Sequence, residues 1–162
     1  MNVSVVGKTV AERLNRARMH FEKAQSSVDK AKLNVGGWTS CFEEVCEGRT
    51  EEGRKFLKEA EKELKEAIKI LEKEVGQFSL RLPEWAKCEL SNLREKSKNL
   101  AEDLEFAYDL CIKSRDCKRT SECYTLAELC DKSLKKLYQR IGRMWFDIDY
   151  ISHWLEEGKT PP

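Results

Sequence analysis

Apolar residues recur along this chain at spacings of three and four, and long runs of Lys and Glu separate them. This spacing places the apolar side chains on one face of a helix. The pattern is interrupted three times, so it predicts four amphipathic helices. We expect them from about Val10 to Val35, from Thr50 to Gly76, from after Pro83 to Cys111, and from Thr120 or Ser121 to Leu155.

Residues with known preferences for helix ends fit these limits. Thr9 is the expected N-cap of the first helix, because Glu12 stands at the capping-box position behind it. Gly36 and Gly37 end that helix. Gly142 lies inside the fourth helix, where a glycine costs stability and indicates close packing or a slight kink.

The order of the helices follows from their register. In an antiparallel pair, residues at the same height have a nearly constant sum of residue numbers. The apolar positions of the last two helices satisfy this rule, for example Leu93 with Ile148, and those of the first two do so as well. The sequence therefore predicts an all-α fold in a single domain over residues 1–162. It is an up-down-up-down four-helix bundle made of two hairpins, at about 8–77 and 84–157.

Four of the seven cysteines lie near the turn of the second hairpin. Cys111 faces Cys130 in the predicted register, and Cys117 faces Cys123 closer to the turn. Facing positions on packed helices come within reach of a disulfide, so two nested disulfides are favoured. Reduced core thiols and a zinc or iron–sulfur site are the alternatives, although the Cys-x-x-Cys spacing of metal sites is absent.

Because seven is an odd number, at least one thiol stays free or pairs with another chain. Cys41 and Cys46 lie in the predicted loop between the first two helices, where a bridge between them would brace the loop. Either could pair with Cys88 instead. Cys88 lies off the apolar seam of the third helix, beside Trp85, and is the best candidate for the free thiol.

Composition indicates where such disulfides could persist. Charged residues make up 36% of the chain, and Lys and Glu greatly outnumber Asn and Gln. This bias resembles that of hyperthermophiles, whose intracellular proteins can be rich in disulfides. The apolar run at the start of the chain is too short for a signal peptide, and no apolar run is long enough to cross a membrane. We therefore expect a cytoplasmic protein without a membrane partner.

Few features indicate an enzyme. The chain has two histidines, no Glu-x-x-His, no Cys-x-x-Cys and no glycine-rich phosphate loop. His20 is expected to be half-buried beside Phe21, and His153 lies opposite the apolar seam of its helix. The register places the two histidines apart. We expect no catalytic residues, no metal and no cofactor, and we favour a function without catalysis.

One short motif indicates an enzymatic alternative. Six residues separate Arg13 from His20. This spacing resembles the Arg-x4-6-His element of the HEPN ribonucleases, which are also helical bundles. The resemblance covers these two residues, and Leu14 follows the arginine where that family usually has a polar residue. It implies a helical ribonuclease as the third functional hypothesis.

Charge is distributed unevenly along the chain, although the net charge is +1. Residues 1–41 and 111–143 are basic, whereas residues 42–110 and 144–162 are acidic. The first and last helices are neighbours in the predicted bundle, so their basic residues would share one side that could bind a phosphate backbone. Stacking on copies of itself and a merely solvated surface are the alternatives. The basic side consists of Arg16, Lys23, Lys30, Lys132, Lys136, Arg140 and Arg143.

Aromatic residues gather in the last part of the fourth helix and make its apolar face wider than one seam. A wide face either contacts both neighbouring helices or docks a partner. The favoured function is therefore a small, non-enzymatic interaction or assembly module that binds a protein partner or forms a homo-oligomer. A nucleic-acid-binding module is the alternative. The expected interface residues are Trp145, Phe146, Tyr150 and Trp154.

Overall fold

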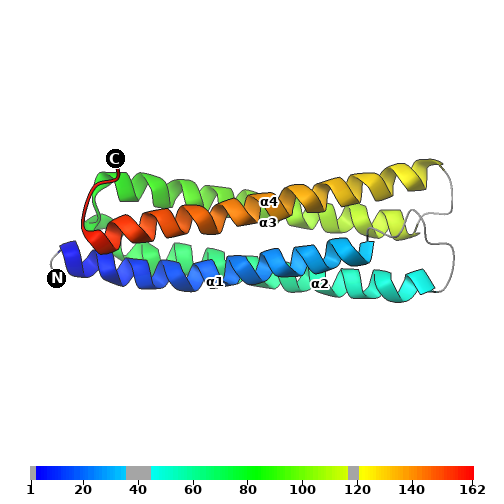
Figure 1. Cartoon of the computed structure of the whole chain (residues 1–162), viewed down its shortest axis with the longest axis horizontal. Helices are drawn as coiled ribbons and strands as arrows, with labels where there is room; N and C mark the ends of the chain where they lie inside the picture. Colours follow the sequence, from blue (N-terminus) through cyan, green and yellow to red (C-terminus); the bar gives the residue numbers. More distant parts are fainter. Residues whose placement is uncertain (1–2, 36–44, 117–120) are drawn as a thin grey trace.

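The apolar stripes of the sequence become four long helices that pack lengthwise as an antiparallel bundle (Figure 1). The structure is a computed structural model that describes residues 3–35, 45–116 and 121–162. Its helices are α1 (Val3–Val35), α2 (Val45–Lys69), α3 (Glu84–Asp116) and α4 (Ser121–Glu157). A π-helix, η1 (Ile70–Val75), and a 3-10 helix, η2 (Gly76–Arg81), continue the chain beyond α2.

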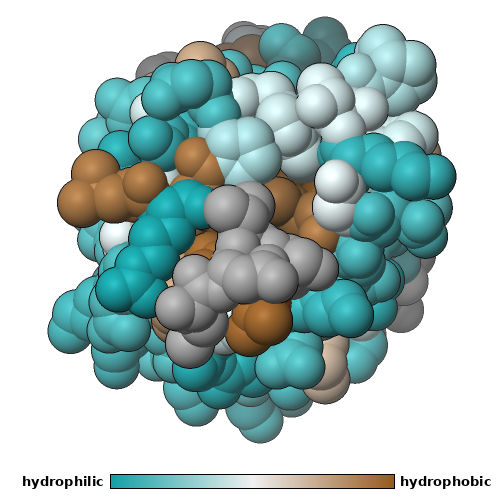
Figure 2. Space-filling view, turned by 90° about the vertical axis from the view of Figure 1, so that its left-hand side faces the viewer, coloured by the Kyte–Doolittle hydropathy of each residue, from teal (hydrophilic) through white to brown (hydrophobic). Residues whose placement is uncertain are grey.

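The arrangement of the helices confirms the predicted up-down-up-down order. Helix α1 packs against α2 and α4, and α3 packs against α4 and, less extensively, against α2. Both ends of the chain lie at the same end of the bundle (Figure 1). The same end, seen along the axis in Figure 2, shows apolar side chains among polar ones. Leu80 in η2 is the most exposed large apolar residue of the described chain, at 89%.

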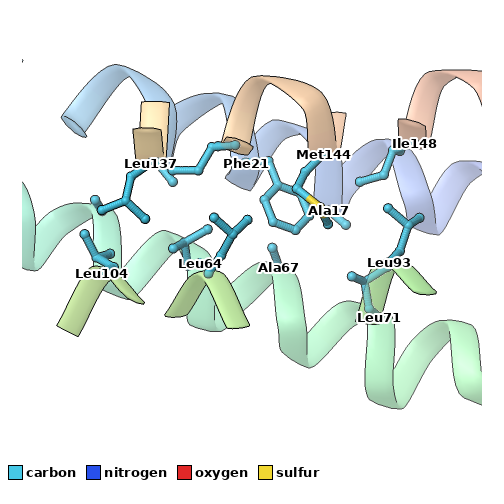
Figure 3. Packing of buried hydrophobic residues seen from close by; sticks show 14 of the residues in the cluster. Ala17, Phe21, Leu64, Ala67, Leu71, Leu93, Leu104, Leu137, Met144 and Ile148 are labelled. Atoms are coloured by element: carbon cyan, nitrogen blue, oxygen red, sulfur yellow. The ribbon is translucent and has the colours of Figure 1, made fainter. Parts of the chain in front are cut away.

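One continuous hydrophobic core runs along the bundle axis and includes almost every predicted seam position. Phe21 and Leu64 face each other in the middle of the close-up view (Figure 3). Leu104 and Leu137 lie at one level of the core, and Leu93 and Ile148 lie at another, as the predicted register requires. Burying a side chain of this size contributes about 1.5–3 kcal/mol, so these layers dominate the stability of the fold.

A disulfide joins Cys111 of α3 to Cys130 of α4, which confirms the pairing predicted from the register. The two Cα atoms are 5.0 Å apart, and both side chains are fully buried. Cys88 is a free, exposed thiol. The predicted Cys117–Cys123 and Cys41–Cys46 bridges fall on side chains outside the described part of the chain, so both stay predictions.

Helices α1 and α2 both begin earlier than the sequence predicts. Thr9 is not an N-cap, because α1 begins at Val3 and the Thr9 hydroxyl donates a hydrogen bond to the Val5 carbonyl inside the helix. Helix α2 begins at Val45 rather than Thr50.

Two glycines bring α1 and α4 close together. A Cβ atom on Gly7 would lie 2.8 Å from the backbone oxygen of Leu155, so only glycine permits this approach. A Cβ atom on Gly142 would lie 2.5 Å from Nε2 of Gln25. The close packing that the sequence indicated at Gly142 is therefore present between the first and last helices.

Among the described residues, no helix combines the length and apolar character needed to cross a membrane.

Candidate functional site

A groove of about 480 Å³ runs along the surface between α1 and α2 and reaches into η1. The π-helix forms one wall, and such rare segments often occur at functional sites because they displace side chains from the regular helical pattern. The apolar part of the lining comes from Met19 and Ile70. The other lining residues are polar or charged: Arg16, His20, Lys23, Glu66, Lys69, Lys73 and Glu74.

His20 is held in place at the edge of this groove. Its Nδ1 atom lies 2.5 Å from Oε2 of Glu63, and both side chains are largely buried, with 26% and 15% exposed. This contact with the carboxylate fixes the orientation of the imidazole ring. His20 is therefore half-buried, as expected, but it is also oriented by an acid that the sequence reasoning missed. The predicted antiparallel register of the first hairpin was the signal for Glu63.

Two arginines share one carboxylate further along the groove. Arg16 donates a hydrogen bond to Glu74 at 2.7 Å, and Arg13 lies 3.6 Å from the other oxygen of Glu74. Arg13 and His20 therefore lie on the same side of α1 but contact different acids. Seven residues of helix place them about 10 Å apart along the axis.

Three lysines complete the groove without any ion pair to another described residue. Lys23 comes from α1, Lys69 from the end of α2 and Lys73 from η1. Two acids, Glu66 and Glu74, stand among the lining residues, so positive charge prevails in the groove. Sequence reasoning grouped Lys23 with α4 and missed the two lysines of the second helix.

The predicted basic side is divided by the structure. The predicted basic residues of α1 lie toward α2: Arg16 contacts Glu74, and the Lys30 ammonium lies 5.7 Å from the ring centre of Phe56. Arg140 of α4 leans the other way and donates to Asp103 of α3 at 2.6 Å. The α4 members Lys132, Lys136 and Arg143 are exposed. Helices α1 and α4 are neighbours, but their basic residues do not face a common groove.

Hydrogen bonds of Arg18, Gln25 and Trp145, none of which belongs to the predicted basic side, join α1 to α4. Arg18 donates a hydrogen bond to Asp149 at 2.7 Å. Trp145 donates its indole N–H to Oε1 of Gln25 at 3.0 Å, and Nε2 of Gln25 donates to the Tyr138 carbonyl at 3.1 Å. Trp145 thus holds the two helices of one chain together.

The other predicted interface aromatics lie farther out on α4. Phe146 is 64% exposed and Tyr150 is 41% exposed. Trp154 is half-buried, and its ring packs edge-on against the rings of Tyr150 and His153, with centroids 6.4 and 5.0 Å away. The aromatic cluster therefore has a buried part and an exposed part.

The exposed part belongs to a second stripe on α4, which we call the outer stripe. It lies opposite the core face and consists of Arg143, Phe146, Tyr150, His153 and Glu157, all exposed. Their spacing of three, four, three and four residues is that of a helix-pairing seam. Sequence reasoning missed the outer stripe as a unit because it assigned the aromatics by type rather than by spacing.

A further charged cluster on α2 is solvated surface. Lys65 donates a hydrogen bond to Glu61 at 2.9 Å, and this bond holds the pKa of Glu61 below its usual value and raises the pKa of Lys65. Pairs of this kind, exposed on one helix, contribute little to stability because water and salt screen the two charges. Within the part of the chain that the structure describes, no group of three or more His, Cys, Asp or Glu residues could hold a metal ion.

Comparison with known proteins gave no relative. No protein-family model matches the chain, and neither a curated protein nor a solved structure matches it. The groove and the outer stripe are therefore interpreted from their own chemistry.

Proposed function

We propose that this protein is a non-enzymatic assembly module that pairs with a second copy of itself through the outer stripe of α4. The supporting observation is the exposure of Phe146 and Tyr150 on a helix whose core face is already filled. Aromatic side chains presented at helix-pairing spacing bury apolar area when a second helix packs on them. The stripe thus offers a seam that the bundle itself does not use.

Charge complementarity along α4 favours a second copy over another protein. Residues 132–143 contain five basic side chains and no acid, whereas residues 144–157 contain four acids and neither Lys nor Arg. Antiparallel pairing about the centre of the outer stripe brings Arg143, the last base of the basic segment, level with Glu157, the last acid of the acidic segment, in the other copy. Opposite charges at these positions select this orientation, because parallel pairing would place like charges together.

An antiparallel pair of identical helices has a twofold axis, and the stripe is centred on Tyr150. With the axis at this residue, Arg143 of one copy lies level with Glu157 of the second copy. Phe146 then lies level with Trp154. Neither Arg143 nor Glu157 forms an ion pair with another described residue, so both are free to pair across the interface. Such an isologous contact is the simplest symmetric assembly.

The oligomeric state of full-length oxidised protein tests this function. Light scattering coupled to size exclusion should give a dimer for the unchanged chain. Phe146→Ser should shift it to monomer, because a central aromatic contact is lost. Phe106→Ser is the matched control, since Phe106 is equally exposed, at 69%, but lies on α3.

Two outcomes would contradict the proposal. One is a monomer for the unchanged protein over the whole accessible concentration range. The other is equal loss of the dimer in Phe146→Ser and Phe106→Ser, which would place the contact elsewhere or show nonspecific hydrophobic association. Circular dichroism of each variant checks that the helices remain folded.

A further inference from the structure

The groove between α1 and α2 is lined by lysines that take no part in the packing of the bundle. Lys23, Lys69 and Lys73 line it without an ion-pair partner among the described residues, although acids abound on this chain. Arg16 stands beside them, and its one carboxylate partner, Glu74, also lies near Arg13. Several unpaired cations in one concave site repel one another, so their arrangement is unfavourable unless an anion joins them.

The floor of the groove has the opposite character. Met19 is 51% exposed and lies beside the half-buried Ile70. Methionine is a flexible side chain that adapts to flat or irregular ligands. A simple inorganic ion would use only the cations, whereas an organic anion would also cover this apolar floor.

The size of the groove limits the ligand. Its volume of about 480 Å³ lies in the usual range for sites that hold small molecules. Arg16 and Lys23 are seven residues apart on α1, which corresponds to about 10 Å. A phosphate-bearing molecule of nucleotide size fits this span, with its phosphates near the cations and its apolar part over Met19 and Ile70.

We propose that the groove between α1 and the α2–η1 segment binds a small organic phosphate of nucleotide size. Lys23, Lys69 and Lys73 bind its phosphate groups, since phosphate oxygens accept several charge-assisted hydrogen bonds at once. His20, oriented by Glu63, lies at the edge of the groove. The π-helix brings Lys73 to the groove, which gives this unusual segment a role. The groove and the outer stripe of α4 share no residue, so both can be occupied together.

Isothermal titration calorimetry on the full-length oxidised protein tests the site, with ATP, adenosine and inorganic pyrophosphate as probes in metal-free buffer of low salt. ATP should bind with one site per chain. Pyrophosphate should bind more weakly because it leaves the apolar floor uncovered, and adenosine should not bind detectably. Added salt should weaken the binding of ATP, since the contacts are ionic.

Variants assign the binding to the groove. Lys69→Ala and Lys73→Ala should each weaken ATP binding by about tenfold, as expected for one lost charge-assisted hydrogen bond. Lys62→Ala is the matched control: Lys62 lies two turns before Lys69 on the same face of α2 but outside the groove. It removes the same charge and should leave the affinity nearly unchanged.

Three results would overturn the proposal. The first is a lack of ATP binding to the unchanged protein at low salt. The second is equal weakening by Lys62→Ala and Lys69→Ala, which would show attraction by overall charge rather than a site. The third is a single-stranded RNA oligonucleotide that binds far more tightly than ATP and with the same dependence on Lys69 and Lys73, which would assign the groove to a nucleic-acid backbone.

Discussion

Single side chains decide how closely the first and last helices approach. At Gly7 an added methyl group would lie 2.8 Å from the rigid backbone oxygen of Leu155. At Gly142 it would meet the end of a flexible glutamine instead. At Gly76 it would meet nothing within 4 Å, and the backbone there is already helical, with φ −56° and ψ −33°. These glycines thus have unequal structural importance.

This difference predicts opposite effects of the same substitution. Gly7→Ala should lower the free energy of unfolding by roughly 1–3 kcal/mol, because α1 and α4 must move apart. Gly76→Ala should raise it by about 0.4–1 kcal/mol, because alanine restricts the unfolded chain without any clash. Guanidinium unfolding followed by circular dichroism measures both. Equal effects of the two variants would refute the close approach at Gly7.

Some single residues could be predicted from the sequence and others could not. Cys111 and Cys130 were paired correctly because both belong to apolar seams, and a seam fixes the height and direction of each position. Lys69 and Lys73 were missed because charged residues occupy most outer positions of this chain, so their type carries little information. Only the packing of α1 against α2 brings them together with Lys23.

At the level of elements, the periodic stretches were predictable and the irregular ones were not. The helices over 84–116 and 121–157 match their stripes because burial of a regular face outweighs local preferences. The sequence does not distinguish the π-helix at Ile70–Val75 from an α-helix. Its two buried residues, Leu71 and Val75, are four residues apart, which is also the spacing of a buried face in an α-helix. The sequence predicts a start at Thr50, where two acids follow a threonine, but α2 begins earlier, at Val45.

The disulfide between α3 and α4 stabilises the second hairpin. Cys111 and Cys130 are 19 residues apart, and closing a loop of this length stabilises the fold by about 3 kcal/mol. The double variant Cys111→Ala/Cys130→Ala should therefore lose roughly 2–5 kcal/mol of unfolding free energy. Cys88→Ala is the control and should change little, because Cys88 is free and exposed. A double variant as stable as Cys88→Ala would show that the link has no energetic role.

For the whole molecule, the topology was predictable but the grouping of its surfaces was not. Adjacent helices were assumed to share a basic side, yet a helix in a bundle has two flanks. Arg16, Lys23 and Lys30 of α1 lie on the α2 flank, and Arg140 lies on the α3 flank. The molecule therefore presents a groove lined mainly by basic side chains on one side and the outer stripe on another, rather than one basic face.

Reversal of charge tests the orientation in which two whole molecules pair. Arg143→Glu should weaken dimerisation by about tenfold, because the introduced carboxylate would lie level with Glu157 of the second copy. Glu157→Arg should do the same by bringing two bases together. The double variant Arg143→Glu/Glu157→Arg has the net charge of the unchanged protein and restores opposite charges across the twofold axis. Dimerisation should therefore recover, as measured by sedimentation equilibrium.

Recovery distinguishes antiparallel pairing from its alternatives. In a parallel pair residue 143 meets residue 143 of the second copy, so each of the three variants would still place like charges together and no recovery would follow. In a contact with a different protein the second reversal would add its own penalty to the first. A double variant at least as weak as either single variant would therefore exclude the antiparallel α4 pair. Recovery would fix both the partner and the direction, since only a chain that carries both changes could compensate for itself.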